Sequence, residues 1–118
     1  LQRVKEVSFE AGVDVDLTLL TGMTNLESFA VIETPISNVS PLQGLRRLRA
    51  VTLHRSNVSD LSPLSNAEQM VYLNAAYSPV ADVSALSKLK VLARLGLFGT
   101  HVRDLAPLRD LVHLEELT

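Results

Sequence analysis

A phrase of five residues occurs four times in this chain at a constant spacing. It is NVSPL at residues 38–42, and it returns as DLSPL at 60–64, DVSAL at 82–86 and DLAPL at 104–108. Each copy begins 22 residues after the one before it, with no insertion between them. A period of this length indicates stacked repeats, in which one short structural unit is copied along the chain.

The repeat frame extends over the whole chain, which we therefore expect to be a single array (residues 1–118). A partial repeat at 1–19 and another at 108–118 flank four complete repeats, which are 20–41, 42–63, 64–85 and 86–107. Terminal repeats of such arrays need a polar or covalently tied cap, and neither end shows one. We therefore expect the sequence to be a piece of a longer array.

The spacing of apolar residues within one repeat predicts its local structure. In the repeat at 42–63, leucines recur every third residue and are followed by the two-residue step from Val51 to Leu53. This step predicts a short strand with Val51 and Leu53 on the core face and their neighbours on the other face. Ser62 and Pro63 then predict a hydroxyl N-cap with proline at the first position of a helical or 3₁₀ turn.

The frame L-x-x-L-x-x-L-x-L-x-x-(S/T)-x-V-x-D-L-x-P-L resembles the 22-residue leucine-rich repeat of the internalin type. The resemblance implies an α/β fold: a right-handed solenoid with a parallel sheet on its concave side and short helical or 3₁₀ segments on its convex side. One column departs from the family, which usually has asparagine there. It holds Gly12, Thr34, Ser56, Ser78 and Thr100. A hydroxyl has fewer donors than an amide, so we expect the loops to keep their ladder with fewer side-chain bonds.

Composition excludes several classes of function. Eleven Lys and Arg against 13 Asp and Glu leave a net charge of -2, so there is no overall basic field for nucleic acid. The chain has no cysteine, which removes disulfides and thiol chemistry but leaves the compartment open. No apolar run approaches the roughly 18 residues of a membrane span, so we expect no membrane insertion by this segment.

Two charged patterns have both a functional and a structural interpretation. A recurrent acidic or amide column consists of Asp16, Asn38, Asp60, Asp82 and Asp104. It could be a row of metal ligands or catalytic acids, but short acidic side chains before a turn commonly accept backbone amide hydrogens, and we favour this interpretation. Arg46, Arg47 and Arg49 form the densest basic cluster, which we interpret as a solvated face.

No catalytic motif is present. His54, His101 and His113 occupy different columns of the frame, and the sequence contains no H-E-x-x-H spacing, G-x-S-x-G elbow or glycine-rich phosphate loop. We therefore expect no enzyme activity, no cofactor and no metal site.

The residues that alternate with the core positions of the strands are free of packing constraints, and solenoids of this kind use that face for binding. Most of the chain's few aromatic residues fall there. Ala76 and Gly96 predict a shallow floor between taller side chains. The candidate protein-binding residues are Tyr72, Asn74, Tyr77, Arg94 and Phe98, flanked by His54 and Arg55. Aromatic and arginine side chains are enriched at protein-recognition hot spots. The alternative is that these aromatics only cover the sheet or pack against a neighbouring segment.

The repeat at 64–85 also has two small residues where the others have large ones. Ala67 replaces leucine or methionine, and Ala75 replaces valine or leucine. Unfilled volume costs stability, so we expect the flexible side chain of Met70 to help fill the core there.

These observations predict a module that binds a protein or peptide on its concave sheet face. A structural or scaffold segment inside a larger multi-protein assembly is the alternative. The identity of the partner and the location of the protein are not determined by the sequence.

Overall fold

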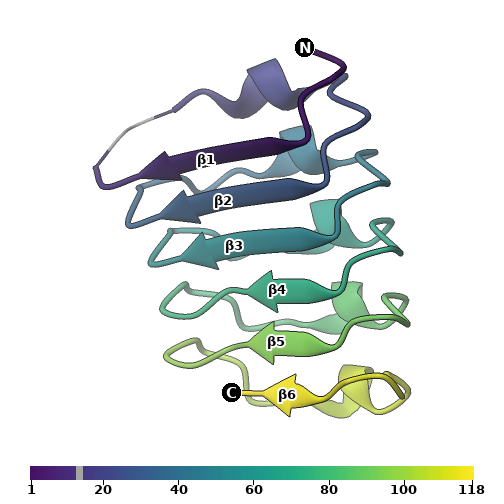
Figure 1. Cartoon of the computed structure of the whole chain (residues 1–118). Helices are drawn as coiled ribbons and strands as arrows, with labels where there is room; N and C mark the ends of the chain where they lie inside the picture. Colours follow the sequence, from purple (N-terminus) through teal and green to yellow (C-terminus); the bar gives the residue numbers. More distant parts are fainter. Residues whose placement is uncertain (13–14) are drawn as a thin grey trace.

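Six strands form one parallel sheet, in which each strand pairs with the next one along the chain (Figure 1). The computed structural model describes residues 1–12 and 15–118. The strands are β1 (Glu6–Glu10), β2 (Ser28–Ile32), β3 (Ala50–His54), β4 (Tyr72–Asn74), β5 (Arg94–Gly96) and β6 (Glu116–Leu117). The chain coils in a right-handed sense from each strand to the next, as parallel crossovers do.

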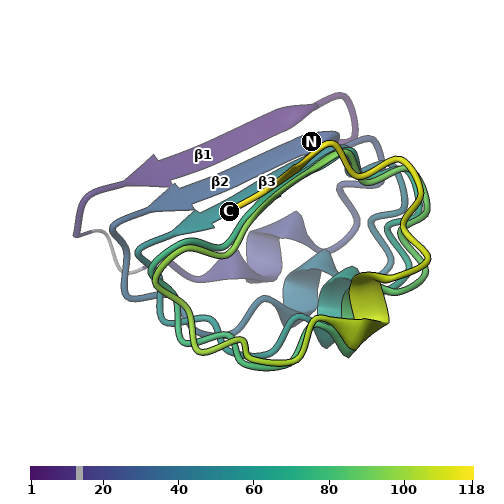
Figure 2. The same cartoon turned by 90° about the horizontal axis from the view of Figure 1, so that it is seen from below.

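Short 3₁₀ helices form the opposite side of the coil (Figure 2). They are η1 (Leu17–Leu20), η2 (Ser40–Leu42), η3 (Ser62–Leu64), η4 (Ser84–Leu86) and η5 (Ala106–Leu108). This arrangement confirms the predicted leucine-rich-repeat solenoid with a parallel sheet on one side and 3₁₀ segments on the other.

The sheet register follows the sequence period. Glu6 pairs with Ser28, and Ala50 pairs with Tyr72, each across 22 positions. The paired residues of neighbouring repeats stand about 4.8 Å apart. Equivalent columns of the sequence therefore become ladders of side chains across the sheet.

The hydrophobic core lies between the sheet and the 3₁₀ segments. Val51 and Leu53 are fully buried, while Ala50, Thr52 and His54 on the same strand are half-buried on the other face. The predicted alternation of the strand is confirmed. We call the face opposite the core the outer face of the sheet.

The acidic column holds the start of each 3₁₀ turn. The side chain of Asp60 accepts a hydrogen bond from the backbone N–H of Ser62 at 2.9 Å. The same bond, at 2.8–3.0 Å, is made by Asp16, Asn38, Asp82 and Asp104. The structural interpretation of this column is confirmed.

The prediction that Ser62 caps its own turn is wrong. Ser62 is the first residue of η3, so the capping position falls on Leu61. The side chain of Leu61 makes no hydrogen bond to the turn. The reason is that the Asp60 carboxylate already accepts the Ser62 N–H from two residues upstream. Pro63 follows in the first turn, where it sacrifices no intrahelical bond.

The hydroxyl column bonds within its own repeat. Ser56 Oγ donates to the Leu53 carbonyl at 2.8 Å and accepts from the N–H of Val58 at 3.3 Å. Ser78 and Thr100 donate to the carbonyl three residues earlier in the same way. Thr34 is buried, but its hydroxyl has no partner among the described residues.

The repeat with two small core residues keeps them shielded from solvent. Ala67 and Ala75 are both buried, and Met70 is fully buried in the same core cluster. The expectation that Met70 contributes to filling this part of the core agrees with its position.

Candidate binding surface

Tyr72 and Arg94 are register partners on β4 and β5, and their side chains lie together on the outer face. The Arg94 guanidinium carbon is 5.6 Å from the centroid of the Tyr72 ring, a cation–π distance. Arg94 Nε also donates to Glu116 Oε2 at 2.7 Å. This bond and the attraction of the Glu116 charge raise the pKa of Arg94, so the guanidinium stays charged.

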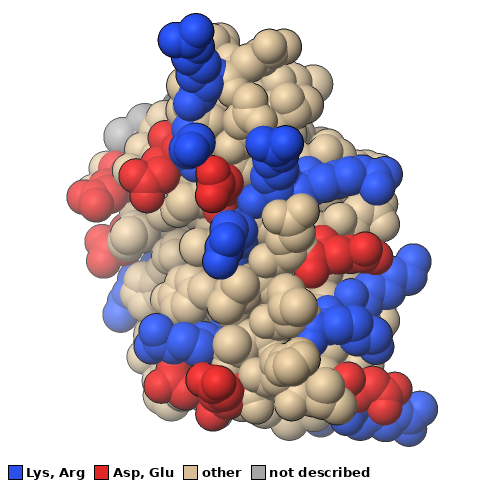
Figure 3. Space-filling view, turned by 45° about the vertical axis from the view of Figure 1, so that its right-hand side comes forward, with Lys and Arg blue, Asp and Glu red and all other residues tan. Residues whose placement is uncertain are grey.

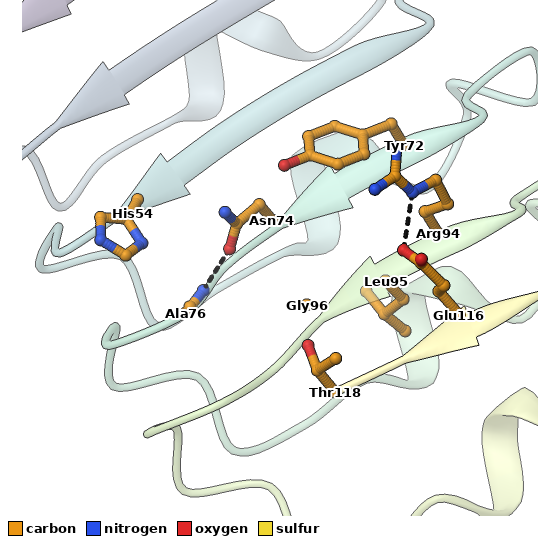
Figure 4. A pocket seen from close by; sticks show the side chains of 9 residues that line it. All are labelled: His54, Tyr72, Asn74, Ala76, Arg94, Leu95, Gly96, Glu116 and Thr118. Carbon is orange, nitrogen blue, oxygen red and sulfur yellow. Dashed lines mark hydrogen bonds and ion pairs between the residues drawn. The ribbon is translucent and has the colours of Figure 1, made fainter.

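A shallow hollow of about 230 Å³ opens beside this pair on the outer face (Figure 4). Ala76 and Gly96, the predicted floor residues, both line it. The remaining lining residues are His54, Tyr72, Asn74, Arg94, Leu95, Glu116 and Thr118. The hollow forms because two registered neighbours on adjacent strands, Asn74 and Gly96, differ in size, and the glycine leaves space beside the amide.

The amide of Asn74 has a fixed orientation in this hollow. Its Oδ1 accepts a hydrogen bond from the backbone N–H of Ala76 at 3.0 Å, and Figure 4 shows this bond. Because a backbone N–H can only donate, the acceptor must be the amide oxygen. The Nδ2 group is therefore the end that remains available to a ligand.

A second group of side chains lies where the strands end, and we call it the aromatic shelf: His54, Arg55, Tyr77 and Phe98. The Tyr77 ring makes edge contacts with His54 and with Phe98, at centroid separations of 5.6 and 5.5 Å. The guanidinium of Arg55 lies 4.6 Å from the centroid of the same ring. Tyr77 thus spans the position of the small Ala76, which is only 8% exposed although it belongs to the outer face.

The turn after each strand brings Tyr77 into this position. Its φ is +60°, in the left-handed region, and Arg55 in the same column has φ of +53°. The next residue of the column is Gly99, with φ of +73°. Since glycine has no side chain, the Tyr77 ring can lie directly beside the Gly99 backbone.

The shelf is exposed to solvent in spite of its internal contacts. Phe98 is 62% exposed and Tyr77 is 43% exposed. The prediction that both tyrosines lie outside the core is confirmed, since Tyr72 is also only half-buried. His54 Nδ1 is buried without a hydrogen-bond partner among the described residues.

The structure arranges the seven candidate residues as two adjoining groups. Tyr72, Asn74 and Arg94 line the hollow; Arg55, Tyr77 and Phe98 belong to the shelf; and His54 belongs to both. Glu116 was missed by sequence reasoning, although it stands 22 residues after Arg94 in the same column. The repeat register was the signal that could have identified it.

Charged groups elsewhere have structural roles. The pKa values of Asp16, Asp60 and Asp82 are lowered, chiefly because each carboxylate accepts a backbone N–H. Among residues 1–12 and 15–118, no group of three potential metal ligands comes together. The same residues contain no helix with the length and apolar character needed to cross a bilayer.

Lys and Arg side chains project from the side where the strands begin, with acidic side chains between them (Figure 3). Arg46, Arg47 and Arg49 belong to this side and are exposed. Arg47 donates to Asn25 Oδ1 at 2.9 Å, and Lys5 pairs with Glu27 at 3.8 Å. The interpretation of the arginine cluster as a solvated face agrees with this mixture of charges.

Known protein structures with the same architecture were found by comparison. No family model matches the chain, and no curated protein matches it. An internalin (inlF) from Listeria monocytogenes has a crystal structure that matches with a TM-score of 0.83 and 36% identity, over 87% of this chain and 31% of that one. The chain thus spans about a third of that internalin.

More distant structures share the fold. The leucine-rich repeat domain of the type III effector XopL matches with a TM-score of 0.79 and 18% identity, over 98% of this chain and 44% of that one. TLR13, in its complex with ssRNA13, matches with a TM-score of 0.75 and 19% identity, over 97% of this chain and 18% of that one. With its six registered parallel strands and its 22-residue period, the chain is a leucine-rich-repeat protein whose repeats are of the internalin type.

Proposed function

We propose that this chain is a recognition module that binds a protein or peptide on the outer face of its sheet. The observation that carries the proposal is the aromatic shelf, in which Tyr77 and Phe98 remain 43% and 62% exposed beside Arg55. Leucine-rich-repeat chains of this kind serve in general as protein-interaction modules. Exposed aromatic and arginine side chains next to a hollow supply the anchors that such interfaces use.

Protein is favoured over nucleic acid as the partner by the charges of this face. TLR13 is a relative in fold that forms a complex with ssRNA13, but a phosphate backbone is bound through a surplus of Lys and Arg. Here Arg94 is paired with Glu116, and the chain as a whole carries a net charge of -2. The sequence contains no catalytic motif, and we propose that the face binds its partner without chemistry.

A pull-down with matched variants tests the proposal. Tyr77→Ala combined with Phe98→Ala removes the exposed anchors, and we expect at least about a 30-fold loss of affinity for the captured partner, as for hot-spot residues. Val112→Ala is the control, because Val112 is 82% exposed and belongs to neither the shelf nor the hollow. Equal capture by the double variant would contradict the proposal, and insolubility of the isolated chain would favour the scaffold alternative.

A further inference from the structure

We infer that the hollow on the outer face receives an acidic side chain, Asp or Glu, of the bound peptide. The inference rests on the proposed function and specifies the chemistry of the partner. It is carried by a surplus of hydrogen-bond donors around the hollow, which the lining residues do not satisfy among themselves.

The orientation of Asn74 supplies the first donors. Its oxygen is occupied by the Ala76 N–H, so the two N–H bonds of Nδ2 are free to serve a ligand. Gly96 leaves space beside the Asn74 side chain, because a β carbon at that position would lie 3.0 Å from Asn74 Oδ1. This space borders the oxygen of the amide, and Figure 4 shows Nδ2 directed away from Gly96.

Arg94 supplies further N–H donors, and its charge is shared with Glu116. Only its Nε donates to a side chain within the described part of the protein, namely to Glu116. A guanidinium has five N–H donors in a planar fork, so the terminal nitrogens can bind a second carboxylate. The hydroxyls of Tyr72 and Thr118 also line the hollow, and no hydrogen bond engages either of them within the described residues.

The acceptors of the hollow are fewer than its donors. Glu116 is its one lining carboxylate in the described chain, and its Oε2 is already bound by Arg94. A basic side chain of a partner could bind Glu116 only through its remaining lone pairs, beside the positive charge of Arg94. An acidic side chain would complete the bonds of Asn74 and Arg94, and charge-assisted bonds of this kind are the stronger ones.

The size of the hollow favours a side chain over a free small molecule. Its volume of about 230 Å³ lies below the roughly 300–1,000 Å³ typical of ligand pockets. The aromatic shelf adjoins it through His54. A peptide with an apolar residue on the shelf can therefore place a neighbouring acid in the hollow.

A random peptide library displayed on phage tests the inference. We expect peptides selected on the wild-type chain to be enriched in Asp or Glu beside an apolar residue. Synthetic copies in which the acid is replaced by its amide should bind about tenfold more weakly, as for the loss of one charged hydrogen bond.

Asn74→Asp is the decisive variant, because it keeps the acceptor for Ala76 N–H and the size of the side chain. It replaces the Nδ2 donor by a negatively charged oxygen. The variant should therefore bind the amide copy of the peptide as tightly as the acidic peptide, or more tightly. Ser8→Asp is the control, because it adds the same charge at an exposed position of β1, far along the sheet from the hollow. This variant should still prefer the acidic peptide to its amide copy. If Asn74→Asp does not fold, Arg94→Gln serves as a second variant, and it too should lose the preference for the acidic peptide.

The outcomes separate this inference from the proposed function. Selected peptides that need Tyr77 and Phe98 but carry no acid would overturn the inference and leave the function standing. Selection of basic peptides that depend on Glu116 would overturn it as well. A library that yields no peptide above background would count against both.

Discussion

A β carbon added at Gly99 would lie 2.6 Å from Cδ1 of Tyr77. Carbon atoms that are not bonded to each other rarely approach so closely, so the ring occupies the space that a side chain at residue 99 would need. The exposed position of the tyrosine thus depends on the absence of a side chain one repeat further along the column.

We therefore expect Gly99→Ala to move the Tyr77 ring and to weaken partner binding. The φ of +73° at Gly99 adds about 1–2 kcal/mol of backbone strain for any residue with a β carbon. Chemical denaturation measures the total destabilisation, and the NMR signals of the Tyr77 ring report its displacement.

Gly44→Ala separates the two effects. Gly44 also has a left-handed φ, of +86°, but a β carbon there would meet nothing within 4 Å. Its alanine variant should show backbone strain alone. The steric explanation would be wrong if Gly99→Ala lowered the free energy of unfolding by no more than Gly44→Ala does. A double-mutant cycle with Tyr77→Ala gives a second check, because removal of the ring should reduce the cost of Gly99→Ala.

Asp60→Asn should make the protein less sensitive to acid. The pKa of Asp60 is lowered from 3.8 in the folded chain, first because it accepts the Ser62 N–H. A carboxylate whose pKa is lower in the folded chain stabilises the fold at any pH above its pKa in the unfolded chain. This stabilisation is lost as the pH falls through the pKa of the folded chain. The variant should therefore lose less stability than the wild type between pH 7 and pH 3, as followed by circular dichroism during denaturant titrations.

The reverse substitution is the control for acid sensitivity. Asn38 accepts the Ser40 N–H at 2.9 Å without a charge, so an amide is sufficient for the bond. Asn38→Asp should add acid sensitivity where none exists at that position. An unchanged pH dependence in both variants would show that these bonds do not contribute to acid unfolding.

Ser56→Ala should destabilise the fold by about 1–3 kcal/mol, because it leaves the buried N–H of Val58 without its side-chain acceptor. Thr34→Val is the column-matched comparison. It removes a buried hydroxyl that has no partner among the described residues, so we expect a neutral or stabilising effect. Urea denaturation of both variants measures the difference, and equal losses would contradict this account of the column.

Met70→Ala should cost about 2–5 kcal/mol, the range for truncating a large buried side chain. Met70 is fully buried in the repeat that already has Ala67 and Ala75 in its core, so its truncation would remove a large side chain from the repeat that has two small ones. Met70→Leu conserves the volume and should cost less than about 1.5 kcal/mol. A small loss for the alanine variant would indicate that the repeat collapses around it.

The sequence determined the array itself. Its 22-residue period predicted the parallel ladder, because each column of the frame becomes a column of the sheet, as Ala50 and Tyr72 show. It also predicted which face each strand residue occupies and that the acidic column bonds backbone amides. These are local or periodic properties, which depend on residue spacing and on short side chains near their own backbone.

Only the tertiary structure decided how the outer side chains meet. The pairing of Arg94 with Glu116, the position of Tyr77 over Ala76 and the orientation of the Asn74 amide depend on side-chain directions that alternation does not fix. The error at Ser62 has the same origin, because the backbone geometry makes Asp60 the acceptor of the Ser62 N–H. A repeat pattern places residues in columns, but contacts between columns follow from the turn at each strand end and from the size of the neighbouring side chains.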